Sequence, residues 1–524
     1  MQLRGSVAHA PAERATGAGI GRPGNTVGGR TGSVRCRAMT VVVDSRQDLT
    51  LERYRRVTVG GEGVALGPGA RRSMDAARAS FVALLESDRT QFIYGVTSHA
   101  GEGARTPIPP EEQRAAARRF AAHHQASATF GREHLPPTAV RGIIFARLAN
   151  LVDGHAKCRP LVAERVAGLL ERPLPRVPLA GEVFSGEIVP LMRVMVGIDP
   201  DELEEGEPMA LVNGSPCSAA LAAEVALRSR NRLGLAEAVF ALSVEALGAP
   251  LEAYDPALRD LWGDPHETAA LDALGALLAG AAREGRRPFQ APVSWRILPR
   301  VLGQAHRAVA AAEDVATIAL RSVTDNPVYL PPDEEHPWGR VFSTGGYHNA
   351  SAYPAIDGVS GSWADLCAIA ERHTMKLHDG PASLLPHHLA GEDGSPTNLL
   401  TLVQVGLGEE ARHEAARTFL PMSESGGFGG QNDVPSPTFL AYGRHGRVAW
   451  CLDACLASLA VTASRALWLT GREPAPPLLP WLDSIRRVVP PDGSPLARDL
   501  GEEVGRLTEV FAVAAEEGTA ALAG

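Results

Sequence analysis

Hydrophobic residues recur at helical spacing along most of this chain. Apolar positions three and four residues apart predict helices over residues 76–85, 137–151 and 159–170. Longer segments of the same kind cover residues 218–247, 299–323, 355–376, 402–419 and 442–470. Such segments exceed the mean helix length of about 11 residues and are typical of large helical bundles. The pattern therefore predicts a mainly α fold with a long central helical bundle.

Polar joints rich in glycine and asparagine separate the long helices. They lie at residues 212–215, 324–327, 344–349 and 426–433. Taken singly, each joint is a helix cap or a turn. Helix N-termini directed at one cavity would together present a positive potential to an anionic group. A further loop, residues 91–110, carries too many glycines and prolines for a helix, and loops of that length inside a compact domain are usually functional.

Composition excludes several classes of partner and cofactor. The chain has 60 acidic and 51 basic residues, a net charge of −9, which argues against a nucleic-acid partner. The most apolar stretch, residues 449–469, contains Asp453 and Arg465, so we expect a buried helix there and no membrane partner. Pyridoxal phosphate requires a lysine for its Schiff base, and the chain offers only two candidates, Lys157 and Lys376. We therefore expect no pyridoxal phosphate.

Cysteine and histidine spacing bears on metals and on location. The six cysteines form no C-x-x-C pair, and the histidines form no H-x-x-x-H pair. We therefore expect no metal site. Cysteines without such a framework are typical of a reduced environment, which predicts a cytoplasmic protein.

Five short blocks, taken in chain order, carry a resemblance to a known family. They are Tyr94-Gly95-Val96-Thr97-Ser98, Met209-Ala210-Leu211-Val212-Asn213-Gly214, Ser294-Trp295-Arg296, Thr324-Asp325-Asn326-Pro327 and Gly345-Gly346-Tyr347-His348. In order and spacing they resemble the aromatic amino acid lyase family, which comprises histidine, phenylalanine and tyrosine ammonia-lyases and the related aminomutases. The similarity runs from about Thr50 to Arg465. It implies the long helical bundle of that family and a homotetramer whose active sites combine loops of several subunits.

The resemblance also implies roles for individual residues. Tyr94 corresponds to the base that takes the β-proton, and Asn213 to the asparagine that contacts the prosthetic group. Arg296 corresponds to the clamp on the substrate carboxylate, and Asn326 is a further catalytic residue. The implied substrate is a small amino-acid-like molecule. The positions expected to line its binding site are Val293, Tyr347, His348, Gln431 and Asn432.

The family's activity depends on a methylideneimidazolone electrophile made from an Ala-Ser-Gly triplet, and here the triplet is Phe184-Ser185-Gly186. The ring closes when the Gly186 nitrogen attacks the carbonyl of residue 184, and Ser185 then loses water. The side chain of residue 184 takes no electronic part in this step, so phenylalanine in place of alanine changes only the steric fit. The segment is also one residue shorter than the family pattern, and Glu187 replaces an aspartate. The sequence is therefore compatible with a segment that forms the ring and with one that does not.

Two substrate-facing positions depart from the family pattern. Val293 stands where the family has a tyrosine that contacts the electrophile. Asn432 stands where histidine lyases have glutamate and phenylalanine lyases have glutamine. The missing carboxylate gives less support to histidine as the substrate, and the sequence does not identify which amino acid is used.

Three functional hypotheses follow. The first is an ammonia-lyase or 2,3-aminomutase that acts on an aromatic or related α-amino acid through the electrophile. The second is an enzyme of the same fold without the electrophile, which uses Tyr94 and Arg296 for another proton transfer, elimination or cyclisation in specialised metabolism. The third is a non-catalytic helical scaffold.

The N-terminal 38 residues differ from the rest, because their arginines stand against a single acidic residue, Glu13. We expect a disordered tail, or a start codon assigned too early with Met39 as the true start. An organelle transit peptide is the alternative. We expect residues 39–200 to carry the Tyr94 loop and the Phe184-Ser185-Gly186 segment. Residues 201–524 would form the long-helix bundle and fold with them as one catalytic unit.

Overall fold

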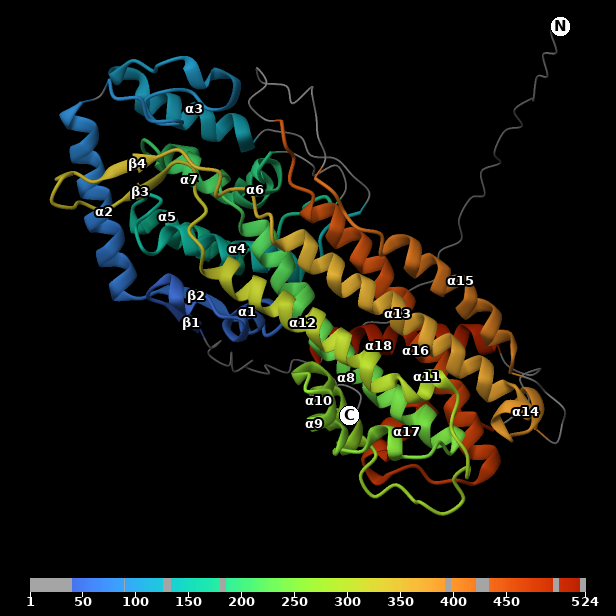
Figure 1. Cartoon of the computed structure of the whole chain (residues 1–524). Coiled ribbons are helices and arrows are strands. Elements are labelled where there is room, and N and C mark those ends of the chain that lie inside the picture. Colours follow the sequence, from blue (N-terminus) through green and yellow to red (C-terminus); the bar gives the residue numbers. More distant parts are fainter. Residues whose placement is uncertain are drawn as a thin grey trace, which may run out of the picture. The chain divides into compact units, whose positions relative to one another are not determined.

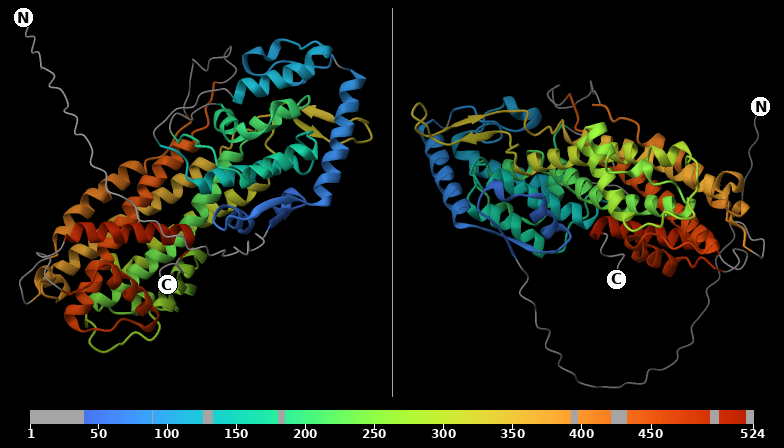
Figure 2. Two further views of the ribbon diagram at one scale, coloured as in Figure 1. Left: turned by 180° about the vertical axis from the view of Figure 1, so that it is seen from behind. Right: turned by 60° about the horizontal axis from the view of Figure 1, so that its bottom comes forward.

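This computed structural model describes residues 40–88, 90–125, 133–179, 185–391, 397–420, 433–492 and 499–518. Within these residues, four helices of 24 to 33 residues form the centre of the fold. They are α8 (Pro216–Leu247), α12 (Leu298–Arg321), α13 (Ala352–His378) and α16 (Thr438–Thr470). α8 packs on α12 and α16, and α13 packs on α12 and α16 (Figures 1 and 2). The predicted mainly α fold with a long central bundle is therefore confirmed.

Shorter elements surround these helices (Figure 1). β1 (Thr40–Val43) pairs in parallel with β2 (Gly63–Leu66), and β3 (Val328–Leu330) pairs antiparallel with β4 (Arg340–Phe342). The remaining helices are α1 (Leu51–Thr58), α2 (Pro68–Ser87), α3 (Gln113–Gln125), α4 (Pro137–Leu151), α5 (Pro160–Gly168), α6 (Ile188–Val194), α7 (Glu207–Val212), α9 (Leu258–Trp262), α10 (Pro265–Leu277), α11 (Val293–Arg296), α14 (Gly380–Ser383), α15 (Leu399–Glu414), α17 (Leu479–Val488) and α18 (Leu500–Glu517).

The ends of the long helices follow from local sequence. α8 begins at Pro216, and the first residue of a helix has no intrahelical partner for its N–H, so a proline costs nothing there. The helix ends at Leu247 and is followed by Gly248, which adopts a left-handed φ of 62°. α4 begins at Pro137 and ends at Leu151, as its apolar pattern predicts. These helices are apolar on nearly every side because they are buried on nearly every side.

Two segments within the described residues, Glu207–Leu247 and Thr438–Thr470, are long and apolar enough to cross a membrane by length and composition alone. Inside the fold, 94% and 89% of their most apolar windows are buried. Asp453 of α16 forms a buried two-pronged contact with Arg232 of α8, with N–O distances of 2.7 and 2.9 Å. Burial among protein helices explains the apolar character of both segments, as predicted for residues 449–469.

One predicted helix ends earlier than its pattern suggests. The apolar spacing predicts a helix to residue 419, but α15 ends at Glu414. The chain leaves the helix because the backbone N–H and the hydroxyl of Thr418 both bind the carboxylate of Asp357 in α13, at 2.7 and 3.0 Å. Pro421 follows in the sequence, and a proline disfavours helix in the residue before it.

The cysteines that the structure describes, Cys158, Cys217, Cys367, Cys451 and Cys455, are free thiols and are buried. Cys451 and Cys455 lie one turn apart on α16 and are core residues. The cytoplasmic location inferred from cysteine usage stays a prediction.

Candidate active site

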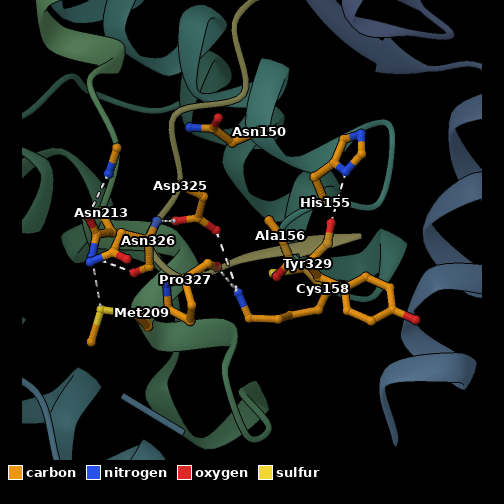
Figure 3. Close-up of polar contacts among 12 residues, drawn as sticks. Asn150, His155, Ala156, Cys158, Met209, Asn213, Asp325, Asn326, Pro327 and Tyr329 are labelled. Carbon is orange, nitrogen blue, oxygen red and sulfur yellow. Dashed lines mark hydrogen bonds and ion pairs between the residues drawn. The ribbon is translucent and has the colours of Figure 1, made fainter. Parts of the chain in front are cut away.

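Two asparagines from distant parts of the sequence meet at one end of the bundle. Asn213 follows α7, and Asn326 lies between α12 and β3. The Asn213 side-chain nitrogen donates to the Asn326 carbonyl at 2.7 Å and contacts the Met209 sulfur at 3.3 Å (Figure 3). The Asn326 side-chain oxygen accepts from the Ser343 hydroxyl at 3.1 Å and from the Thr344 N–H at 2.8 Å. Both side chains are thus held in defined orientations.

A group of buried charges lies directly behind this pair. A guanidinium nitrogen of Arg147 donates to the Asn213 carbonyl, and another lies 3.7 Å from the Asp325 carboxylate. The Lys157 ammonium lies 3.8 Å from the other oxygen of Asp325 and donates to the Pro327 carbonyl at 2.6 Å. Burial lowers the pKa of Arg147 and of Lys157, and the Asp325 carboxylate counteracts that lowering.

The Ser185-Gly186 pair lies against the same region. The Ser185 hydroxyl donates to the Val434 carbonyl at 3.0 Å. Gly186 has a φ of 97°, and a Cβ built there would lie 3.3 Å from the Tyr347 ring. The ring therefore covers the glycine, and the backbone at this position is one that a side chain would strain.

Glu187 ties this segment to the start of α8. Its carboxylate accepts from the backbone N–H groups of Cys217 and Ser218, at 2.5 and 2.7 Å. Burial raises the pKa of Glu187 to about 7, against the lowering effect of those hydrogen bonds. A carboxylate that binds free N–H groups at a helix N-terminus is a favourable cap, so the segment before α6 is anchored to α8.

Tyr94 joins the site from the 91–110 loop. Its hydroxyl accepts from the Gly101 N–H at 2.9 Å. Gly95 packs so closely on Met209 that a Cβ there would lie 2.5 Å from the methionine methyl group. Burial raises the pKa of Tyr94, the Gly101 hydrogen bond lowers it, and the neighbouring phenol of Tyr347 raises it. The loop thus reaches Asn213 through Met209 and reaches Gly186 through Tyr347.

His348 completes this group. Its Nε2 lies 3.4 Å from the Pro435 carbonyl, beside the residue that binds Ser185. The structure therefore brings together, from separate elements, the predicted residues Tyr94, Ser185, Gly186, Asn213, Asn326, Tyr347 and His348. The predicted residues Phe184, Gln431 and Asn432 lie outside the described residues.

Arg296 and Val293 lie elsewhere in this chain. Both belong to α11, which precedes α12, whereas Asn326 follows the end of α12 (Figure 1). A helix of 24 residues spans about 36 Å. The Arg296 side chain is exposed, and its Nε donates to the Ala291 carbonyl at 3.0 Å. Val293 is 57% exposed. A single chain therefore does not bring the predicted carboxylate clamp to Asn213.

Sequence reasoning missed Arg147 and the arrangement of charges around Asp325. A signal was available, since Arg147 and Asn150 interrupt the apolar run that fills the second half of α4, from Ile143 to Leu151. A polar residue on such a helix is buried, and buried polar residues are the informative ones. No group of three or more histidine, cysteine, aspartate and glutamate side chains in the described ranges is arranged to hold a metal ion.

Comparison with known proteins identifies the family. The model of the family described as aromatic amino acid lyase matches residues 49–198 and 192–487. The histidine ammonia-lyase of Anaeromyxobacter dehalogenans (strain 2CP-C) is 27% identical over 519 residues, which cover 90% of this chain and 98% of that protein.

Solved structures are similar over nearly the whole chain. The ergothionase of Treponema denticola matches with a TM-score of 0.81 at 17% identity and covers 91% of this chain and 99% of its own. The tyrosine aminomutase of Streptomyces globisporus matches with a TM-score of 0.78 at 22% identity, over 93% and 98% of the two chains. At these identities the likeness shows the fold.

The long bundle, with polar residues gathered where its helices end, defines a helical lyase. The chain belongs to the aromatic amino acid lyase family. It is a carbon–nitrogen lyase or an aminomutase that acts on a small amino-acid substrate. The resemblance and the predicted enzyme class are therefore confirmed, and the scaffold hypothesis is set aside.

Proposed function

We propose that this chain is an ammonia-lyase or 2,3-aminomutase that acts on an aromatic or related α-amino acid through a methylideneimidazolone electrophile formed from Phe184-Ser185-Gly186. The observation that carries the proposal is that Tyr94, Gly186 and Asn213 gather around one polar site in a chain of this family. They come from different elements and are joined through Tyr347 and Met209.

The described residues fit the electrophile. Gly186 has the left-handed φ of 97° that a compressed turn requires, and the Ser185 side chain is buried with its hydroxyl held by the Val434 carbonyl. Asn213 lies nearby with its amide oriented by Asn326. The electrophile, once formed, supplies a bond to the substrate amino group that makes this group a better leaving group.

Tyr94 is the proposed base for the β-proton. That proton is barely acidic, so the tyrosine must act as a phenolate near neutral pH. Burial opposes this state by raising the pKa of Tyr94. A cation or a helix N-terminus beside the phenol would stabilise the phenolate.

Arg296 is the proposed clamp for the substrate carboxylate, because a guanidinium binds a carboxylate with two parallel hydrogen bonds. It lies at the far end of α12 from Asn326, so we propose that another copy of the chain supplies it in a homotetramer. Exposed apolar side chains support such an assembly. They include Val293 and Ile297 beside Arg296, and Leu399, Leu402 and Val403 on α15.

The test of the electrophile is the mass of the purified chain, with peptide mapping across residues 181–191. We expect this segment to be two water molecules lighter than its sequence. One water carries away the carbonyl oxygen of residue 184 when the ring closes, and the other is lost from Ser185. Ammonia release would then be screened with phenylalanine, tyrosine and histidine, and the products would be examined for β-amino acids, which distinguish an aminomutase. Tyr94→Phe should abolish activity in a folded chain. Tyr54→Phe is the matched control, because it likewise removes one buried tyrosine hydroxyl, which donates to the Ala220 carbonyl at 2.9 Å.

The alternative is an enzyme of the same fold without the electrophile. Phe184 in place of alanine, Glu187 in place of aspartate and the shorter segment favour it, because an ångström of misplacement in a ring closure costs about 100-fold in rate. An unmodified mass would support this alternative. Tyr94 and Arg296 would then serve a different proton transfer, elimination or cyclisation.

A further inference from the structure

Lys157 is a buried charge that the proposed mechanism does not use. It is one of two lysines in the chain, and its side chain is fully buried. It lies in the turn between α4 and α5, behind the Asn213–Asn326 pair. Removing an ammonium from water is costly unless the fold compensates for it.

The backbone at this position favours glycine. Lys157 has a φ of 55°, in the left-handed region that side chains rarely adopt. The turn is held in place by two hydrogen bonds between His155 and Tyr329 of β3, each 2.9 Å long. Figure 3 shows the one made by the His155 ring. Glycine would fit this backbone with less strain, and the chain uses 54 glycines elsewhere. The side chain therefore has a purpose beyond filling space.

Charge balance does not explain the ammonium. Arg147 already faces the Asp325 carboxylate at 3.7 Å, so one cation is present for one anion before Lys157 is counted. The closest contact of the ammonium is the Pro327 carbonyl at 2.6 Å, whereas the carboxylate is 3.8 Å away. Its stronger interaction is thus with the backbone turn that carries Asn326.

That turn orients both asparagines. The Asn326 N–H donates to Asp325 at 3.1 Å, and the Asn326 carbonyl accepts from the Asn213 amide at 2.7 Å (Figure 3). A shift of the turn would therefore move the Asn213 amide as well. Lys157 and Asp325 bind the backbone of the Asn326–Pro327 turn. Ser343 and Thr344 bind the side-chain oxygen of Asn326.

We propose that Lys157 is a positioning residue, whose ammonium fixes the Asn326–Pro327 turn and thereby sets the orientation of the Asn213 amide for the reaction. This inference rests on the proposed function for its catalytic consequence. The positioning itself is a property of the folded chain, so it can be measured without a substrate.

Two variants separate the ammonium from the backbone conformation. Lys157→Met removes the charge and keeps the strained φ, while the Arg147–Asp325 pair stays balanced. Lys157→Gly removes the charge and relieves the strain. The control is Lys376→Met, because Lys376 is a half-exposed lysine near the end of α13 that pairs with Asp379, the residue after the helix. We expect both Lys157 variants to lower kcat by about 10- to 100-fold with KM nearly unchanged, and the control to match wild type.

Hydrogen exchange supplies the second measurement. We expect faster amide exchange in residues 207–216 and 322–330 of both Lys157 variants, with the thermal midpoint of Lys157→Gly close to that of wild type. A kcat within twofold of wild type in both variants overturns the proposal. If wild type releases no ammonia from any amino acid, the proposed function fails, and exchange alone then decides. Unchanged exchange in both segments would overturn the positioning role.

Discussion

Arg296 and Asn326 lie at opposite ends of the same helix, α12, which separates them by about 36 Å. The substrate carboxylate and its amino group are only a few bonds apart. One chain therefore does not place its own Arg296 beside its own Asn213. If Arg296 is the carboxylate clamp that we propose, a second copy must supply it, with its α11 end against the Asn213 end of the first. Closed symmetric assembly is the usual way in which chains share sites.

Subunit complementation tests this arrangement. Tyr94→Phe and Arg296→Ala should each be inactive alone. In a 1:1 mixed assembly, about a quarter of the sites would combine an intact Tyr94 from one chain with an intact Arg296 from another. We expect ammonia release to recover to about that fraction.

The control for complementation mixes Tyr94→Phe with Asn213→Ala. Both changes affect the half of the site that one chain supplies, so no mixed site is complete and no recovery is expected. Light scattering should give the mass of four chains. Recovery in the control, or a single-chain mass, would contradict a shared site.

Gly186→Ala should prevent formation of the electrophile. An alanine at a φ of 97° is strained by about 1–2 kcal/mol, and its methyl group would lie 3.3 Å from the Tyr347 ring. We expect a folded chain whose segment 181–191 keeps its full mass. Gly168→Ala is the control, because Gly168 has open space around it and a helical φ of −64°. A loss of two waters in Gly186→Ala would show that the glycine conformation is not required.

The helices and the site differ in how far the sequence predicts them. The ends of α4 and α8 follow from prolines at their starts and from local signals at their ends, so short-range patterns suffice. Tyr94, Asn213 and Asn326 were found because each lies in a recognisable block. The contact between Lys157 and Pro327 joins residues 170 positions apart, and no local pattern encodes it. The separation of Arg296 from Asn326 was predictable, since the helix expected over residues 299–323 already implies it.

Glu187 gives the chain a pH dependence of stability with a definite sign. Its pKa rises from 4.5 to about 7 on folding because the carboxyl group is buried. The folded chain thus holds this proton to a higher pH than the unfolded chain does. The stability that this contributes is full below pH 4.5 and is lost as the pH rises through about 7. The difference in unfolding free energy between wild type and Glu187→Gln should therefore fall by about 1.4 kcal/mol per pH unit between pH 5 and 7.

Thermal unfolding at pH 5, 6, 7 and 8 measures this difference. Glu171→Gln, which changes an exposed glutamate that precedes α6 in the sequence, is the matched control for the substitution itself. A difference for Glu187→Gln that does not change with pH would mean that its carboxyl group titrates alike in the folded and unfolded chains.

Three buried histidines give the stability of the chain a pH dependence opposite in sign to that of Glu187. Burial lowers the pKa of His373 and His445 to about 3 and that of His378 to about 4. The folded chain keeps them neutral, whereas the unfolded chain protonates them near pH 6.5. Their contribution to stability is present above pH 6.5 and is lost as the pH falls toward 3 to 4. Together they should make stability fall by up to about 4 kcal/mol per pH unit below pH 6.

His445→Gln isolates one of these three protons. Glutamine keeps an acceptor near the Ser360 hydroxyl, which lies 3.0 Å from the His445 ring, but it cannot be protonated. We expect the difference in unfolding free energy between wild type and His445→Gln to be constant above pH 6.5 and to shrink by about 1.4 kcal/mol per unit as the pH falls from 6 to 4. Carboxyl groups that also titrate in this pH range are present in wild type and in the variant, so their contributions cancel in the difference. A difference that stays constant down to pH 4 would mean that His445 is protonated in the folded bundle, and then a negative charge or a water path must reach it between α13 and α16.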